Sequence, residues 1–79
     1  MSRFFFNVPA AGIVDREGTD LESVAAVLDE AIARSREIIA HAVSVDEEER
    51  QNWVLEATNE AGRTILAMRL SDAMIGTKG

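Results

Sequence analysis

The chain contains no cysteine and only one histidine, so it cannot supply the ligands of the common zinc sites. The lack of cysteine also excludes disulfides as a source of stability. No glycine-rich phosphate loop is present, because Gly12 and Gly18 stand alone and no lysine follows them. We therefore assign no catalytic, cofactor-binding or metal-binding residue, and we expect no cofactor and no enzymatic activity.

Long apolar runs and basic residues are also scarce. No stretch approaches the roughly 20 apolar residues of a membrane span. Asn7 and Pro9 interrupt the apolar start, which is too short for a signal peptide. Eight Lys and Arg against 14 Asp and Glu give a net charge of −6, which argues against nucleic acids and anionic membranes as partners. We expect a cytoplasmic protein.

What the sequence does contain is enough apolar material for one small core. The chain has 79 residues, of which 47% are hydrophobic. We predict a single domain over residues 1–75 and a disordered tail at residues 76–79. Oligomerisation would stabilise a domain of this size.

An apolar stripe predicts a long helix from about Leu21 to Val43. Its apolar positions recur every seven residues, close to two helical turns, and so share one face. Thr19 and Glu22 have the spacing of a capping box at its start, and Asp20 is a competing N-cap. The stripe consists of three columns: Leu21, Leu28, Ser35 and Ala42; Val24, Ala31 and Ile38; and Ala25, Ile32 and Ile39. The Ser35 hydroxyl, on this face, is expected to bond back to a helical carbonyl.

Two short strands are predicted before this helix. Residues 3–8 are rich in phenylalanine and end at Pro9, which cannot donate to a ladder. Ile13 and Val14 are expected to form a second strand, hairpinned with the first. Residues 15–18 then form a turn.

Two further strands follow the helix. Residues 44–51 are a polar connection, after which residues 52–58 and 63–70 alternate between apolar and polar side chains. Residues 59–62 form the turn between them, with glycine at its last position. Residues 71–75 are expected to form one helical turn.

These elements predict an α+β fold, a two-layer ββαββ arrangement with a four-stranded antiparallel sheet and one long helix packed on one face. The expected register places Leu55 opposite Leu66 and Trp53 opposite Met68. The strand order stays open. The predicted core comprises Phe4, Phe6, Val8, Leu21, Val24, Leu28, Ala31, Ile32, Ile38, Trp53, Leu55, Leu66, Met68 and Leu70.

Three segments resemble a family of short uncharacterised bacterial proteins, a domain of unknown function. Residues 3–8 (Arg-Phe-Phe-Phe-Asn-Val) are similar to the family's Arg-Tyr-Phe-Phe-Asp-Val start. Residues 15–21 and the Trp-x-Leu-x-Ala-x-Asn-Glu-Ala-Gly-Arg run at 53–63 match it too, with Asn59 where the family usually has Asp. The resemblance covers residues 3–73 and implies neither an activity nor catalytic residues.

The few residues that suggest chemistry have simpler interpretations. His41 follows Glu37 by one helical turn on the expected outward face, where a solvated side chain is favoured over a general base. Asp15, Glu17 and Asp20 have the spacing of a calcium loop, but its closing glutamate is missing, so a turn and helix cap are favoured. The acidic run at 46–49 is interpreted as a solvated linker rather than a cation site.

One surface remains as a candidate for binding. The sheet face away from the helix is predicted to carry apolar side chains rimmed by polar ones, a composition that often marks contact surfaces. Isolated exposed apolar residues, which need no partner, are the competing interpretation. The candidate interaction surface comprises Phe5, Val54, Ile65, Ala67 and Arg69.

We therefore expect a small non-enzymatic protein-interaction module that meets a protein partner or a second copy of itself. A homodimer through the outer sheet face or a sheet edge is the first hypothesis. A regulatory or antitoxin-like module that binds a different protein is the alternative, by analogy of fold alone. A small-ligand binder or an enzyme comes last, because one helix on four strands leaves little room for a pocket.

Overall fold

In the computed structural model, which describes residues 2–42 and 44–75, the three phenylalanines lie on strand β1 (Ser2–Asn7). Phe4 and Phe6 point into the core and are 9% and 2% exposed. Phe5 points to the opposite face because side chains alternate along a strand. Pro9 begins a 3-10 turn, η1 (Pro9–Ala11), and Gly12 closes the turn with a φ of 73°. The predicted first strand and its end are thus confirmed.

The second strand lies later in the chain than predicted. Strand β2 is Thr19–Leu21, which pairs antiparallel with the first three residues of β1. Ile13 forms only an isolated bridge with Val8, and Val14 is 62% exposed. Ile13 and Val14 therefore do not form a strand, because the chain returns to the β1 ladder only after the turn at residues 15–18.

The long helix, α1, is Val24–His41. Ser23 is its N-cap, and the Ser23 hydroxyl accepts a hydrogen bond of 3.1 Å from the Ala26 N–H. The predicted capping box of Thr19 and Glu22 is wrong, since Thr19 already belongs to the β2 ladder. The helix ends before Val43, which lies outside the described residues.

The second half of the chain contains two strands and two short helices. The acidic connection includes a short helix, α2 (Glu47–Gln51), where only a polar linker was predicted. Strands β3 (Val54–Thr58) and β4 (Thr64–Arg69) form the expected hairpin, and α3 (Leu70–Ile75) confirms the predicted final turn of helix. The predicted tail at residues 76–79 lies outside the described residues.

The hairpin register differs from the predicted one by two residues. Leu55 pairs with Met68, and Leu66 pairs with Ala57. A shift of two keeps every side chain on its predicted face, so hydrophobic alternation cannot detect it. The Asn59 side chain sets the turn, because its Oδ1 accepts hydrogen bonds from the N–H groups of Ala61 and Arg63.

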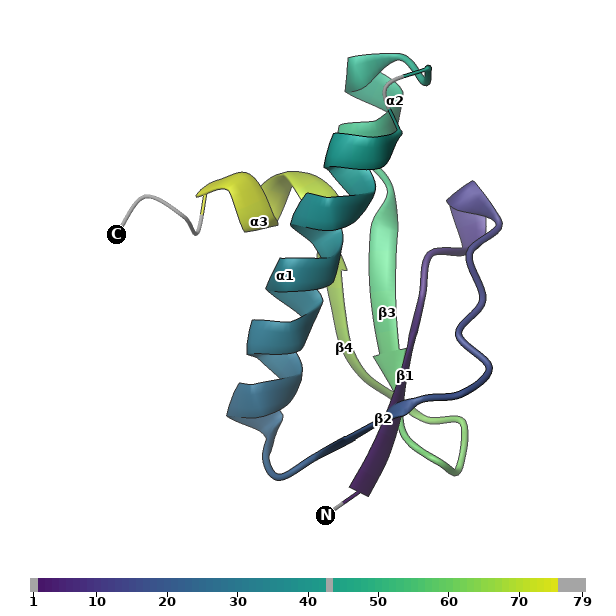
Figure 1. Cartoon of the computed structure of the whole chain (residues 1–79), viewed down its shortest axis with the longest axis vertical. Coiled ribbons are helices and arrows are strands. Elements are labelled where there is room, and N and C mark those ends of the chain that lie inside the picture. The colour runs from purple at the N-terminus through teal and green to yellow at the C-terminus, as the bar shows by residue number, and fades with distance from the viewer. Residues whose placement is uncertain (1, 43, 76–79) are drawn as a thin grey trace.

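The strands form one antiparallel sheet in the order β2-β1-β3-β4, and α1 and α3 lie against the same side of it (Figure 1). This confirms the predicted α+β fold. The buried stripe of α1 consists of Val27, Ala31 and Ser35. Val24 and Leu28 were predicted for the core but are 66% and 42% exposed. The N-terminal turns of α1 extend beyond the part of the helix that the rest of the chain covers. Fully buried residues that the prediction missed are Val27, Ala57 and Ala73.

Candidate functional site

The predicted interaction surface lies on the sheet face opposite α1, and three strands contribute to it. β3 and β4 bring Val54 directly opposite Arg69 and Glu56 opposite Ala67. Val54 and Ile65 are 39% and 37% exposed. These two residues and Ala67 form one group, which we call the outer-face patch.

Phe5 belongs to the same face but is partly covered. A Cβ atom built on Gly18 would lie 2.8 Å from Phe5 Cε2 and 2.6 Å from Arg3 Cγ, so the backbone of the turn at residues 15–18 packs closely against both side chains. The Phe5 side chain is half-buried as a result. The exposed apolar part of the predicted surface is therefore centred on β3 and β4 rather than on β1.

A β-bulge shapes the start of β4. Ala57 pairs with Leu66 and the next residue, Thr58, pairs with Thr64, so Ile65 is an extra residue on β4. Bulges bend an edge strand and increase its local twist. The bulge at Ile65 therefore limits regular pairing with a further strand to residues 66–69, the part of β4 that follows it.

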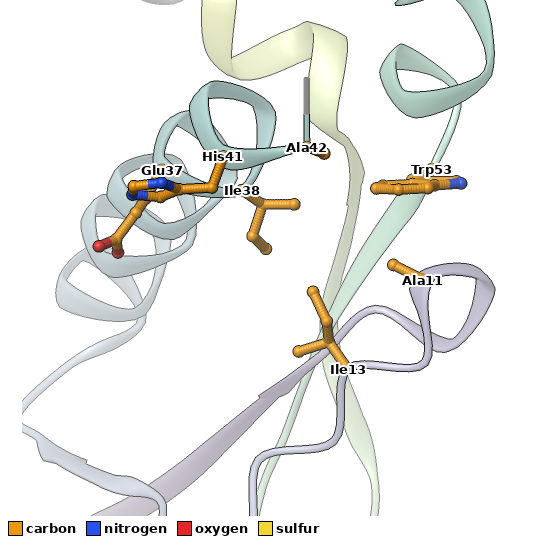
Figure 2. Close-up of a pocket in the computed structure, with 7 residues that line it drawn as sticks. All are labelled: Ala11, Ile13, Glu37, Ile38, His41, Ala42 and Trp53. Carbon is orange, nitrogen blue, oxygen red and sulfur yellow. The ribbon is translucent and has the colours of Figure 1, made fainter. Parts of the chain in front are cut away.

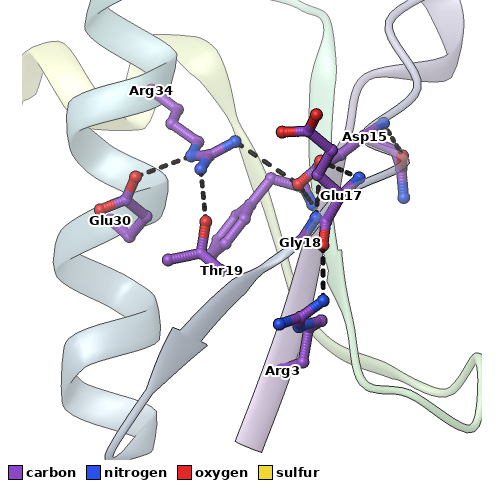
Figure 3. Close-up of polar contacts among 9 residues, drawn as sticks. Arg3, Asp15, Glu17, Gly18, Thr19, Glu30 and Arg34 are labelled. Carbon is purple, nitrogen blue, oxygen red and sulfur yellow. Dashed lines mark hydrogen bonds and ion pairs between the residues drawn. The ribbon is translucent and has the colours of Figure 1, made fainter.

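A polar network on the other side of the sheet joins α1 to the loop before β2 (Figure 3). Arg34 on α1 donates through Nε to Glu30 at 2.8 Å and through Nη2 to the Thr19 hydroxyl at 2.8 Å. Its Nη1 lies 3.5 Å from a carboxylate oxygen of Asp15, and its guanidinium lies 4.6 Å from the centroid of the Phe6 ring. Arg34 thus forms an i,i+4 pair with Glu30 and also reaches inward, to the loop before β2 and to β1.

Asp15 accepts a backbone hydrogen bond from β1 beyond the residues that β2 pairs with. Its Oδ2 accepts from the Phe6 N–H at 3.1 Å, and its Oδ1 accepts from the N–H groups of Glu17 and Gly18. Burial alone would raise the pKa of Asp15, but these hydrogen bonds and the Arg34 charge outweigh it and hold the pKa below its usual value. The network therefore acts as a structural clamp, because its carboxylate is already saturated by backbone donors.

Arg3 extends this network across the turn. Its Nε lies 3.2 Å from Asp20, and its Nη1 donates to the Glu17 carbonyl. The hydrogen bond to Asp20 and the charge of that carboxylate raise the pKa of the Arg3 guanidinium above its usual value. Of the three acids considered above as a calcium loop, Asp15 and Asp20 thus form ion pairs at the turn, and Glu17 contributes its backbone N–H and C=O groups.

A pocket of about 330 Å³ lies at the C-terminal end of α1, between that helix, the loop after β1 and the residue before β3 (Figure 2). The prediction that the fold leaves little room for a pocket is wrong. Three segments far apart in the sequence form the walls, so no local pattern could reveal it. Its lining residues are Ala11, Ile13, Glu37, Ile38, His41, Ala42 and Trp53.

The chemistry of this pocket is mainly apolar. Trp53 faces Ala42 and Ala11 from one side, whereas Glu37 and His41 project from α1 on the other side (Figure 2). His41 is exposed, as predicted, but it lies at a pocket rim rather than on an isolated surface. Glu37 and His41 lie at the rim, while Ile13 and Ile38 form an apolar wall.

Residues 2–42 and 44–75 contain no group of three or more His, Asp or Glu side chains placed to hold a metal ion. Within those ranges, none of the helices combines the length and the apolar character needed to cross a bilayer.

The comparisons with known proteins identify a family and no activity. Neither the curated proteins nor the solved structures include a significant match to this chain. A family model described as a domain of unknown function, DUF6894, matches residues 3–71, a range that includes the long helix and, apart from Ser2, the four strands. The chain therefore belongs to the DUF6894 family of domains of unknown function.

Proposed function

We propose that this protein is a small non-enzymatic interaction module that associates with a second copy of itself through the β4 side of its sheet. The outer-face patch is the observation that carries the proposal. Val54 and Ile65 lie on adjacent strands at more than one-third exposure, on the sheet face that α1 and α3 leave open. Ile65 and Ala67 lie on the edge strand itself, so a partner seated along β4 removes their apolar surface from water, which favours association.

The distribution of charge supports this choice of surface. The chain carries a net charge of −6, but β4 itself contains no acidic residue and one arginine, Arg69. Three consecutive glutamates lie on α2, which is at the C-terminal end of α1 (Figure 1). Two copies that meet along β4 therefore keep these acids apart, which limits their repulsion. The same excess of acids disfavours nucleic acids and anionic membranes as partners.

The proposal of a non-enzymatic role rests on the state of the ionisable groups. The Asp15 carboxylate is occupied by three backbone N–H groups and by Arg34. Glu37 and His41 lie on one helix at the pocket rim, and a general base needs a partner that orients it toward a bound substrate. These groups are arranged for structure and solubility.

Sedimentation equilibrium over a wide range of concentrations tests the proposal. The wild-type chain is expected to show a reversible dimer. Ile65→Thr keeps the β-branched shape and removes apolar surface on the edge strand, so the dimer should weaken by about tenfold or more. Val14→Thr, at a residue that is 62% exposed outside the patch, is the matched control and should leave the dimer unchanged. A wild-type chain that stays monomeric up to millimolar concentration would overturn the proposal.

The pocket supports a second candidate function, the binding of a compact, largely apolar molecule. A volume of about 330 Å³ lies at the lower end of the range of small-molecule sites. Trp53 is the only tryptophan and the chain has no tyrosine, so its fluorescence reports on this pocket. Titration with 2-phenylethanol should change Trp53 emission saturably, and Ile38→Asp should abolish the change. Emission that stays constant, or that changes equally in both proteins, would exclude this candidate.

A further inference from the structure

The free edge of β4 exposes backbone groups that are ready to pair. The Leu70 N–H donates to the Trp53 carbonyl at 2.9 Å, in register with the pairs Val54–Arg69 and Leu55–Met68. Hydrogen-bonded and non-hydrogen-bonded pairs alternate in an antiparallel ladder. The backbone N–H and C=O groups of Met68, two residues before Leu70, therefore also point toward β3. The N–H and C=O groups of Ala67 and Arg69 therefore point away from β3, to the side where the sheet ends.

Apolar side chains lie beside this edge on the helical side of the sheet. Arg34 marks the flank of α1 that faces β1 and β2, and Leu28 lies on the opposite flank of the buried stripe, toward β4. α1 and β4 run in the same direction, and α3 covers only the end of β4 (Figure 1). Leu28 and Val24 are 42% and 66% exposed, and Leu66 on the inner face of β4 is half-buried. The helical layer and the sheet are therefore open to solvent beside β4, along the part of the strand that α3 does not cover.

We propose that the second copy pairs antiparallel with β4, strand to strand, so that Ala67 of one copy faces Ala67 of the other and the two sheets become one of eight strands. This inference rests on the proposed function and adds its geometry. Of the two edges, β4 has six residues and β2 has three, with an acidic residue, Asp20, in its centre. Short length and charge protect an edge strand from pairing, so β4 is the edge suited to a partner.

The register follows from which residues share a face and from the bulge at Ile65. Residues directly opposite each other must lie on the same face, so the two-fold axis of a self-paired strand lies midway between a residue and its own copy. An axis at Leu66 would pair Met68 with Thr64 of the second copy, which lies beyond the bulge. An axis at Ala67 keeps the central pairs in the regular part of β4 and sets Arg69 beside Ile65 of the second copy, where its aliphatic stem can cover that exposed side chain.

The antiparallel arrangement also covers the open apolar side. α3 follows directly from the end of β4. With the axis at Ala67, the end of β4 in one copy lies beside the start of β4 in the other. α3 is thereby carried to the level of Leu66 and Leu28 of the second copy, which α3 of that copy does not reach. An unrelated strand that carries no such helix would leave these side chains uncovered, so this geometry favours a second copy.

Cross-linking tests the geometry, since the wild-type chain has no cysteine to interfere. Ala67→Cys should give a covalent dimer in high yield with a short bismaleimide, and Ala33→Cys, on the exposed face of α1, should give little. A charge pair tests the register. Both Ile65→Glu and Ile65→Arg remove the apolar side chain, but only Ile65→Glu can pair with Arg69 of the second copy, so Ile65→Arg should weaken the dimer more, by about tenfold or more.

Blocking the edge gives a further measurement. Ala67→Pro removes an N–H that points away from β3, which an edge strand tolerates, so the monomer should fold while the dimer is lost. The circular dichroism spectrum checks the fold, and the cross-linking result stands even if this variant fails to fold. A dimer that survives in folded Ala67→Pro, or that is weakened equally by both Ile65 variants, would overturn the strand pairing and leave self-association intact. A monomeric wild type would instead overturn both.

Discussion

Arg34 on α1 lies 3.5 Å from the carboxylate of Asp15, and this contact joins the helical layer to the loop that precedes β2. The same guanidinium reaches Glu30, Thr19 and the ring of Phe6. Only 31% of the Arg34 side chain is exposed, so these interactions are less screened than those of a surface ion pair. The network holds the loop against the sheet and leaves the opposite face free.

We predict that Arg34→Met lowers the free energy of unfolding by about 1–2 kcal/mol, because the stem still packs while the hydrogen bonds and the contact with Phe6 are lost. Arg36→Met, at an exposed position on the same helix, should change it by less than about 0.5 kcal/mol. Urea unfolding followed by circular dichroism measures both. Equal effects at the two positions would contradict the structural role of Arg34.

Asp15 should make stability depend on pH in the acid range. Its pKa is lowered in the folded state, so its contribution is present above the ordinary value of 3.8 and is lost as pH falls through the folded pKa. Asp15→Asn should therefore be less stable than wild type at neutral pH, and the difference should shrink as the pH falls below 3.8. Urea midpoints measured across this range test the sign. A difference that stays constant with pH would show that the Asp15 charge is not involved.

Two glycines with similar backbone angles should respond differently to alanine. Gly12 and Gly18 have φ values of 73° and 77°, which cost a side-chain-bearing residue about 1 kcal/mol. Gly12 has open space around it, whereas a Cβ on Gly18 would clash with Arg3 and Phe5. Gly18→Ala should therefore destabilise by roughly 2 kcal/mol or more and Gly12→Ala by only about 1. Thermal unfolding compares them, and equal losses would rule out the close approach at Gly18.

Two serines on α1 should have opposite effects. Ser23 caps the helix, so Ser23→Ala should cost about 1 kcal/mol. Ser35 is fully buried and its hydroxyl has no hydrogen-bond partner, contrary to the predicted bond to a helical carbonyl. Ser35→Ala removes that unpaired group and introduces a better helix former, so it should stabilise by about 1 kcal/mol. Destabilisation by Ser35→Ala would mean that the hydroxyl is satisfied in solution.

The sequence predicted the fold where the local pattern and the tertiary contacts agree. Alternation around Leu55 and Leu66 and the glycine at position 62 indicated the hairpin, and the structure confirms both strands. The helix start was wrong because Thr19 suits both an N-cap and a strand, and pairing with Phe4 decides between them. Helical periodicity identified an apolar face, but it could not show that the rest of the chain does not cover that face at Val24.

The candidate site was predictable only in part. Strand alternation placed Val54 and Ala67 on the outer face, and their strand neighbours confirm that placement. It could not show that the turn at Gly18 packs against Phe5, since that contact depends on the path of a loop. The pocket beside Trp53 depends on three separate segments, and the role of the surface in binding stays a prediction.

The Asp15 carboxylate has a consequence for how large an assembly can grow. It takes the hydrogen bond that the Phe6 N–H would otherwise offer to an incoming strand, and β2 closes the rest of that edge with three residues. The outer side of β2 offers an incoming strand only three residues, with the charge of Asp20 in their centre. In the proposed dimer, growth by further strand addition is therefore disfavoured, which protects the molecule from polymerising into filaments.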